Sequence, residues 1–291
     1  MKRMITVGSR DSKLAVAQTL LVIDALKSAD PELEIRLHTL KTTGDRILDR
    51  TLDEIGGKGL FVRELDEALL DGRIDLAVHS LKDLPMECHP DLVTAAYLQR
   101  GDPRDALVLP EEERPLSVIG TSSSRRRLQA AALYPESSFQ PVRGNINTRL
   151  KKLDGGEYSA LILAAAGLVR AGLERRISRL FAPEEILPAA GQGILAVQCR
   201  KGCKSPLFKS INHRKTELAA LAERSFVRAL DGGCSAPTAA YAEIKGNEIK
   251  LTGFYADPEG SFQVKGSLTG SSEEAERLGA RLAEELKGKT V

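Results

Sequence analysis

Short apolar runs and amphipathic stretches alternate along the first two thirds of the chain. The run at 5–7 is typical of a strand and is followed by a helical pattern. The apolar face of this helix comprises Leu14, Ala17, Leu21 and Ala25. A second strand is expected over 35–39, where apolar and polar residues alternate. Alternating strands and helices predict a mostly parallel sheet with helices on both faces.

Turn residues separate these elements. Ser12 is a natural N-cap for the first helix, and Asp30-Pro31 stops it. A glycine-rich loop at 56–59 precedes a helix expected over 60–70, and a third, buried strand is expected over 74–78. The segment His79–Pro85 then lies at the carboxyl end of that strand, where ligands of open α/β sheets bind.

The same order restarts near residue 117. A strand over 117–119 leads through a Gly-Thr-Ser turn at 120–124 into a helix over 125–133. Further strands are expected over 139–142 and 160–163. The repeat predicts two similar α/β lobes that face a cleft.

The remaining segments connect the lobes or form a third domain. We expect one linker at 99–103 and a second crossing at 187–193, followed by an apolar strand over 194–198 whose lobe the pattern does not assign. From residue 216 a helix reaches about residue 230, hairpin signals join several strands, and an amphipathic helix over 272–286 ends the pattern. This tail is predicted to be a small α+β domain.

Composition fits a globular protein, and the charge is unevenly placed. The chain has 291 residues, 42% hydrophobic and 28% charged, with a formal net charge of +2. Only Glu136 opposes the basic residues between 120 and 152. They are Arg125, Arg126, Arg127, Arg143, Arg149, Lys151 and Lys152. Guanidinium groups bind carboxylates and phosphates in a bidentate manner, so a polyanionic ligand fits; a solvated helix face is the alternative.

Other classes of partner have weaker support. A nucleic-acid surface would need stacking aromatics, and only Tyr134 and Phe139 lie near the basic segment. An apolar run long enough to cross a membrane is missing, as is a signal-peptide pattern. We therefore expect a cytoplasmic protein with no membrane or nucleic-acid partner.

Cysteine spacing favours neither disulfides nor a metal site, so no metal is expected. The thiols are Cys88, Cys199, Cys203 and Cys234. Only Cys234 follows a Gly-Gly turn that can present a thiol as a nucleophile, although buried, inert cysteines are more common. Asp83, after a buried strand, is able to stabilise a cation or to serve as a turn residue, and His79 fits hydrogen-bonded structure better than a base.

Together, several motifs resemble porphobilinogen deaminases (hydroxymethylbilane synthases) along almost the whole chain. They are Gly56–Phe61, His79–Pro85, Gly120–Ser123, Arg143–Asn145, Ala190–Gly193 and Leu230–Cys234. The resemblance implies two periplasmic-binding-protein-like lobes and a small α+β third domain. The implied boundaries are 1–98 plus about 194–212 for domain 1, 99–193 for domain 2 and 216–291 for domain 3.

The resemblance also implies an activity. A dipyrromethane primer, held by a thioether to Cys234, would receive four porphobilinogen molecules with loss of ammonia, and hydrolysis would release a linear tetrapyrrole. Asp83 would offset the positive charge that develops on pyrrole nitrogen during each coupling. Lys58 would lie on a mobile loop over the cleft. The implied state is a monomer.

The acetate and propionate groups of the pyrroles would need cationic and polar ligands. The resemblance assigns this role to Arg10, Ser12, Lys82, Ser123, Arg125, Arg126, Arg143, Arg149 and Arg170. Lys13, Ser124 and Gln198 depart from the family pattern and affect neighbouring loops rather than these residues. A two-lobed anion-binding or sensory protein is the alternative that the repeat and the arginines alone would fit.

Overall fold

The structure is a computed structural model, which describes residues 4–42, 62–112, 114–203, 205–230 and 237–290. The chain divides into two compact units, Met1–Arg100 with Ile194–Glu217, and Gly101–Gly193 with Leu218–Val291. Within the described residues, none of the helices combines the length and apolar character needed to cross a membrane.

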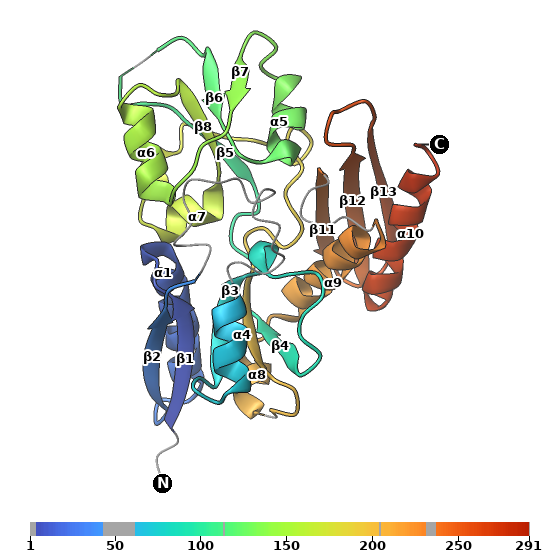
Figure 1. The fold of residues 1–291 in the computed structure, drawn as a ribbon. Coiled ribbons are helices and arrows are strands. Elements are labelled where there is room, and N and C mark those ends of the chain that lie inside the picture. Colours follow the sequence, from blue (N-terminus) through green and yellow to red (C-terminus); the bar gives the residue numbers. More distant parts are fainter. Residues whose placement is uncertain (1–3, 43–61, 113, 204, 231–236, 291) are drawn as a thin grey trace. The chain divides into compact units, whose positions relative to one another are not determined.

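The first unit is built on a five-stranded sheet in the order β2-β1-β3-β10-β4 (Figure 1). Its strands are β1 (Met4–Arg10), β2 (Glu34–Leu40), β3 (Leu76–Ser80), β4 (Leu92–Tyr97) and β10 (Leu195–Arg200). β1 runs parallel to β2 and β3, whereas β10 runs antiparallel to β3 and β4. Its helices are α1 (Lys13–Ala29), α4 (Arg63–Leu70) and α8 (Pro206–Ile211), with a 3₁₀ turn η1 (Leu81–Asp83).

Helices cover both faces of this sheet because successive side chains of a strand point to opposite faces. Leu76 and Val78 of β3 pack in one core cluster with residues of α1 and α8. Ala77, which lies between them, packs instead with Leu65 and Leu69 of α4. The buried strand is thus apolar on both sides, as predicted for the centre of an α/β sheet.

Two local signals fix the elements of this unit. The Ser12 hydroxyl accepts a hydrogen bond from the backbone N–H of Ala15 at 3.2 Å, which confirms the predicted N-cap of α1. The third strand begins two residues later than predicted. The N–H of Ile74 bonds back to the carbonyl of Ala68 at the end of α4, so Ile74 does not join the ladder.

The second unit contains a sheet in the order β7-β6-β8-β5-β9. Its strands are β5 (Asp105–Val108), β6 (Val118–Gly120), β7 (Ser138–Gln140), β8 (Ala160–Ala164) and β9 (Arg179–Leu180). β6 is parallel to β7 and β8, and β5 is antiparallel to β8 and β9. The accompanying helices are α5 (Ser124–Ala131), α6 (Ile146–Asp154), α7 (Ala165–Arg170) and the 3₁₀ turn η2 (Glu174–Arg176). β7 ends before Pro141, which lacks the N–H that a ladder needs.

The two sheets share one topology, so the predicted repeat of two similar α/β lobes is confirmed. In each sheet the three parallel strands, counted along the chain, lie in the order second, first, third. An antiparallel strand from a segment next to a predicted crossing between the lobes then pairs with the third strand. That strand is β10 in the first sheet and β5 in the second. In each sheet the other four strands point the same way, so the expectation of a mostly parallel sheet is confirmed except at β10 and β5, and the strand predicted at 194–198 belongs to the first sheet.

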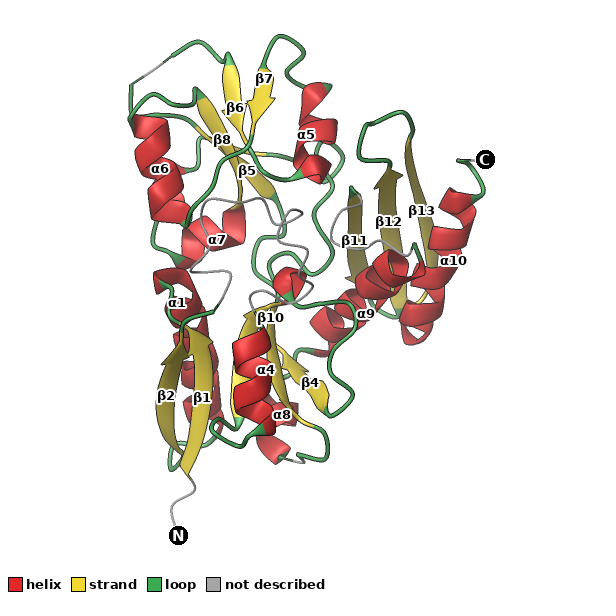
Figure 2. Ribbon diagram, viewed as in Figure 1, coloured by secondary structure: helices red, strands yellow, loops and turns green. Residues whose placement is uncertain are grey.

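The tail of the chain forms an antiparallel sheet with two helices, an α+β arrangement (Figure 2). The strands are β11 (Thr238–Lys245), β12 (Glu248–Ala256) and β13 (Gln263–Ser271), and the helices are α9 (Arg214–Ala229) and α10 (Ala275–Lys287), preceded by η3 (Ser272–Glu274). A side chain at Gly253 of β12 would overlap Phe226 of α9 and crowd Leu282 of α10, so both helices pack on the same face. Gly279 lets α10 approach the carbonyl of Ala222 in α9.

Candidate functional site

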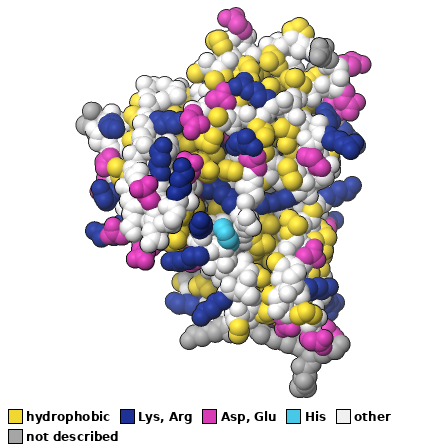
Figure 3. Space-filling view, turned by 180° about the vertical axis from the view of Figure 1, so that it is seen from behind, with side chains coloured by type: hydrophobic (Ala, Val, Ile, Leu, Met, Phe, Trp, Pro, Cys, Tyr) yellow, Lys and Arg dark blue, Asp and Glu magenta, His cyan; other side chains and the backbone are white. Residues whose placement is uncertain are grey.

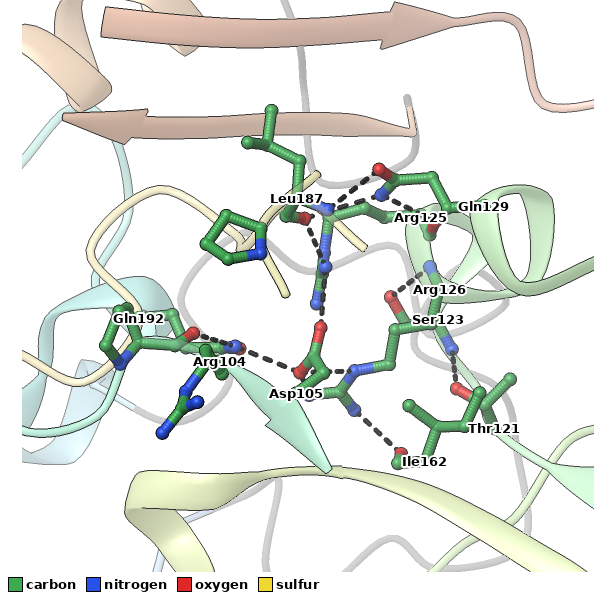
Figure 4. Close-up of polar contacts among 12 residues, drawn as sticks. Arg104, Asp105, Thr121, Ser123, Arg125, Arg126, Gln129, Ile162, Leu187 and Gln192 are labelled. Atoms are coloured by element: carbon green, nitrogen blue, oxygen red, sulfur yellow. Dashed lines mark hydrogen bonds and ion pairs between the residues drawn. The ribbon is translucent and has the colours of Figure 1, made fainter. Parts of the chain in front are cut away.

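A buried group of charged and polar side chains lies in the second unit (Figure 4). Its members are Asp105, Arg125, Arg126 and Gln192, and we call them the Asp105 cluster. Asp105 is the first residue of β5, and the two arginines stand in the first turn of α5. The side chain of Asp105 is fully buried, and those of Arg125 and Arg126 are 6% and 10% exposed.

The carboxylate of Asp105 lies between the two guanidinium groups, as Figure 4 shows. Nε and Nη2 of Arg126 donate to Oδ1 at 3.0 and 2.8 Å. Nη1 of Arg125 lies 2.8 Å from Oδ2 in an ion pair. One carboxylate therefore holds both arginines at once.

Backbone carbonyls and an amide complete the cluster. Nη1 of Arg126 donates to the carbonyl of Ile162 at 3.2 Å, and Nη1 of Arg125 donates to that of Leu187 at 2.6 Å. The Gln192 amide donates to Oδ1 of Asp105 at 2.9 Å and to the carbonyl of Pro103 at 2.7 Å. The cluster thus joins β5, α5, β8 and the turn before β10.

The electrostatics of the cluster follow from burial and charge count. Burial opposes ionisation of Asp105, but the two guanidinium groups outweigh it and hold the pKa of this carboxyl well below its usual range. Burial lowers the pKa of Arg125, while Asp105 acts in the opposite direction, and an arginine stays protonated in proteins. Two cations and one anion leave an excess of positive charge in a buried place. Such a site favours an anionic ligand.

The turn before α5 presents this cluster. The Ser123 hydroxyl accepts from the N–H of Arg126 at 3.4 Å, so Ser123 caps α5. Gly120 has no room for a side chain, because a Cβ would overlap Leu161 and Tyr158. Gly8 stands at the corresponding place of the first sheet and is crowded by Ile74 in the same way. Glycine in β1 and at the end of β6 therefore lets neighbouring side chains pack closely against the strand backbone.

The other predicted arginines of the second unit are Arg143, Arg149 and Arg170. Arg149 of α6 donates through Nε to the carbonyl of Gly144 at 2.8 Å, next to the half-buried Arg143. Arg170, at the end of α7, donates to the carbonyl of Gly193 at 2.5 Å. Burial lowers the pKa of Arg170 to about 10, so it remains a cation at neutral pH.

In the first unit the predicted residues follow the ends of two neighbouring strands. Arg10 ends β1 and Ser12 follows it, while Lys82 and Asp83 form η1 directly after β3. Because β1 and β3 are paired and parallel, their carboxyl ends meet at one edge of the sheet. Asp83 is exposed there and Lys82 is half-buried. His79 is buried and hydrogen-bonded to Gln198 at 3.0 Å, which confirms its structural interpretation.

Two predicted residues lie outside the described residues, Lys58 and Cys234. Of the other thiols, Cys199 is buried, and burial, followed by the effect of Cys203, raises its pKa to about 12. Within the described residues, Cys88, Cys199 and Cys203 form no disulfide. Among the residues that the structure describes, no group of three His, Cys, Asp or Glu side chains is placed to hold a metal ion.

Asp105 and Gln192 were not recognised as site residues from the sequence. The Gly191-Gln192-Gly193 segment forms a tight turn with positive φ angles at both glycines. The Gln192 side chain nevertheless reaches Asp105, 87 positions earlier in the chain. The signals in the sequence were a polar residue between two turn glycines and the Ala190–Gly193 motif that contains it.

Comparison with known proteins identifies the family. The model of the porphobilinogen deaminase dipyromethane cofactor binding domain matches residues 5–206, and that of the C-terminal domain matches residues 217–288. A porphobilinogen deaminase of Acetivibrio thermocellus is 53% identical over 285 residues, which cover 97% of each chain. One of a Nostoc species is 45% identical, over 98% of this chain and 92% of the relative.

The fold and the cluster define a protein of two α/β lobes with an α+β tail and a buried cationic site. The chain belongs to the porphobilinogen deaminase family. Its matched family domain is one that binds a dipyrromethane cofactor.

The solved structures to which the chain is similar are much more distant. The BenM effector binding domain with its effector benzoate is 16% identical, with a TM-score of 0.42 over 80% of this chain and 96% of that chain. The periplasmic aliphatic sulphonate binding protein SsuA from Escherichia coli is 15% identical, with a TM-score of 0.41 over 79% and 71%. Likenesses of this size say nothing about the ligand of this chain.

Proposed function

We propose that this chain is a transferase of tetrapyrrole synthesis that condenses four porphobilinogen molecules head to tail and releases hydroxymethylbilane. The growing chain is attached to a dipyrromethane primer, which is linked through a thioether to Cys234. The observation that supports this assignment most strongly is the positive charge of the Asp105 cluster. It lies inside the region matched by the cofactor-binding family domain.

The residues present fit a dipyrromethane group. Every pyrrole unit derived from porphobilinogen has an acetate and a propionate, so the group is polyanionic. Arg125 and Arg126 provide two ordered guanidinium groups for such carboxylates, and within the Asp105 cluster they outnumber the one buried carboxylate. When bound, the primer supplies the nucleophilic pyrrole carbon to which substrate is added.

Further ligands for the carboxylates come from residues at the ends of strands and the starts of helices. Ser12 and Ser123 cap α1 and α5, where helix N-termini favour anions. The cations that we assign to the same role are Arg10, Lys82, Arg143, Arg149 and Arg170. Lys58 is assigned to a loop that shields the substrate.

Asp83 is the residue that we assign to the reaction itself. Loss of ammonia from porphobilinogen leaves an electrophilic methylene pyrrole, and bond formation places positive charge on pyrrole nitrogen. A carboxylate that accepts a hydrogen bond from that N–H lowers the free energy of the cation. Within the described residues Asp83 is exposed after β3, so its carboxylate is accessible to a substrate.

The proposal is tested by incubating the purified protein with porphobilinogen. We expect release of ammonia together with a linear tetrapyrrole. Binding of porphobilinogen without release of ammonia would refute the proposal and support an anion-binding protein instead.

We also infer a cytoplasmic location, a monomer and no nucleic-acid partner. Burial of Arg125 and Arg126 supports the last inference, because it removes two cations of the basic segment from the surface. Figure 3 shows acidic and basic side chains interspersed over one face of the described residues. Light scattering tests whether the protein is a monomer, and DNA binding at several salt concentrations tests whether it has a nucleic-acid partner. A steep salt dependence of DNA binding would contradict the inference that it has none.

A further inference from the structure

Two consecutive arginines on a helix do not by themselves point to one place. Successive residues of an α-helix are about 100° apart around the axis. Arg125 and Arg126 nevertheless converge, because each guanidinium contacts a different oxygen of Asp105. The carboxylate therefore decides where both cations lie.

Protein groups hold both guanidinium groups in this converged arrangement. The carbonyl of Leu187 accepts a hydrogen bond from Arg125, and the carbonyl of Ile162 accepts one from Arg126. Long arginine side chains lose considerable freedom when they become ordered. A protein that orders them in advance avoids that loss on binding, which strengthens the interaction with a ligand.

The donors of the two arginines are used unequally. The contacts of Arg126 involve Nε, Nη1 and Nη2. Within the residues that the structure describes, the contacts of the Arg125 side chain involve only Nη1. Nε and Nη2 of Arg125 form the edge of a guanidinium that binds a carboxylate in a bidentate manner.

Gln192 holds the carboxylate itself in place. Its amide donates to Oδ1 of Asp105, the oxygen that also accepts both hydrogen bonds from Arg126. The glutamine is 1% exposed and is also hydrogen-bonded to Pro103. The neutral amide adds no charge, so it fixes the orientation of Asp105 without reducing the positive excess of the cluster.

We propose that Asp105 is a positioning residue that, with Gln192, orders the guanidinium groups of Arg125 and Arg126 for binding the carboxylates of the pyrrole ligand. The part of this statement that concerns the pyrrole ligand rests on the proposed function. The ordering of the guanidinium groups does not depend on it, and the two can be tested separately.

The first measurement concerns order in the ligand-free protein. Asp105→Asn is compared with the parent by nitrogen-15 NMR of the arginine Nε–H groups, after assignment with single arginine variants. We expect the signals of Arg125 and Arg126 to shift and broaden in Asp105→Asn. The matched control is Asp154→Asn, which removes a carboxylate from a surface pair with Arg176 in the same unit. It should leave both signals unchanged, and unchanged signals in folded Asp105→Asn would overturn the proposal.

The second measurement concerns the ligand. In a Cys234→Ser background, which prevents a covalent link, porphobilinogen binding is measured by equilibrium dialysis. Since a charged hydrogen bond depends strongly on geometry, we expect Asp105→Asn to weaken binding by about tenfold or more and Asp154→Asn to leave it within about twofold. A merely structural residue would lower the unfolding temperature without changing the affinity of the folded fraction, and that result would overturn the role in binding.

If Asp105→Asn fails to fold, Gln192→Met decides the question. This variant removes the hydrogen bonds of the Gln192 amide to Oδ1 of Asp105 and to the carbonyl of Pro103, and it leaves all three charges in place. We expect altered NMR signals of Arg126 and binding that is weaker by a few-fold; a folded Gln192→Met protein with parental signals and affinity would overturn the proposal. A parent protein that does not bind porphobilinogen would refute the proposed function, whereas the NMR comparison would still decide the role of Asp105.

Discussion

The buried His79 makes stability depend on acid in a defined range of pH. His79 lies on β3, is 5% exposed and is hydrogen-bonded through Nε2 to Gln198. Burial lowers its pKa from 6.5 to about 4, and the bond to Gln198 offsets only part of this effect. The histidine is therefore neutral in the folded protein at pH values where the unfolded chain already binds a proton.

The sign and size of the effect follow from this difference. Between pH 6.5 and 4 the His79 side chain binds more protons in the unfolded state than in the folded state, so its contribution to the free energy of unfolding falls as the pH falls. This contribution is fully present above pH 6.5, and its loss of about 3 kcal/mol is complete below pH 4. Asp66 of α4, which lies next to Gln198, acts in the opposite direction. Burial raises its pKa to about 6, so protonation of Asp66 favours the folded state in part of the same range.

Replacement of His79 by glutamine isolates the effect. Glutamine keeps a donor toward Gln198 and does not titrate. Urea unfolding of the parent and of His79→Gln at pH 7, 6, 5 and 4.5 should show an acid-induced loss that is about 2 kcal/mol smaller in the variant. The control is His38→Gln on β2, where the side chain is only partly buried and the parental pH dependence should persist. Equal slopes for parent and His79→Gln would refute the reasoning.

Three further changes test other parts of the structure. Asp83→Asn should keep the fold and the primer but lose about 100-fold or more in turnover, measured as ammonia release; near-normal turnover would remove Asp83 from the mechanism. Arg126→Lys should lower the free energy of unfolding by more than Arg125→Lys, because Arg126 makes three hydrogen bonds within the Asp105 cluster; equal losses in urea unfolding would contradict the unequal use of donors. Gly279→Ala should destabilise by about 1–3 kcal/mol despite its better helix propensity, because the added Cβ would overlap the carbonyl of Ala222; a higher unfolding temperature would show that the helices separate easily.

Short sequence patterns predicted the helix caps, the strands and the repeat of the two lobes, because these features depend on residues close together in the chain. Ser12 capped the first helix as expected, and the duplicated turns at Gly8 and Gly120 indicated two similar lobes. The antiparallel strands β5 and β10 were harder to place. Each joins its sheet through pairings with strands far away in the sequence, and periodicity within a short window does not encode such partners.

The Asp105 cluster shows the same limit for the site. The basic residues around Arg125 and Arg126 were evident in the sequence, but their partner was not. Asp105 precedes Arg126 by 21 positions, and a single aspartate near a proline is typical of a turn. Only the fold shows that this residue is fully buried between two cations.

The most direct test of the account is the intact mass of the protein purified from cells that make porphobilinogen, followed by mapping of the peptide that contains Cys234. The account predicts a mass above that of the sequence by one dipyrrole, located on this peptide and absent from Cys234→Ser. An unmodified mass, or a pyrrole on any other residue, would contradict it.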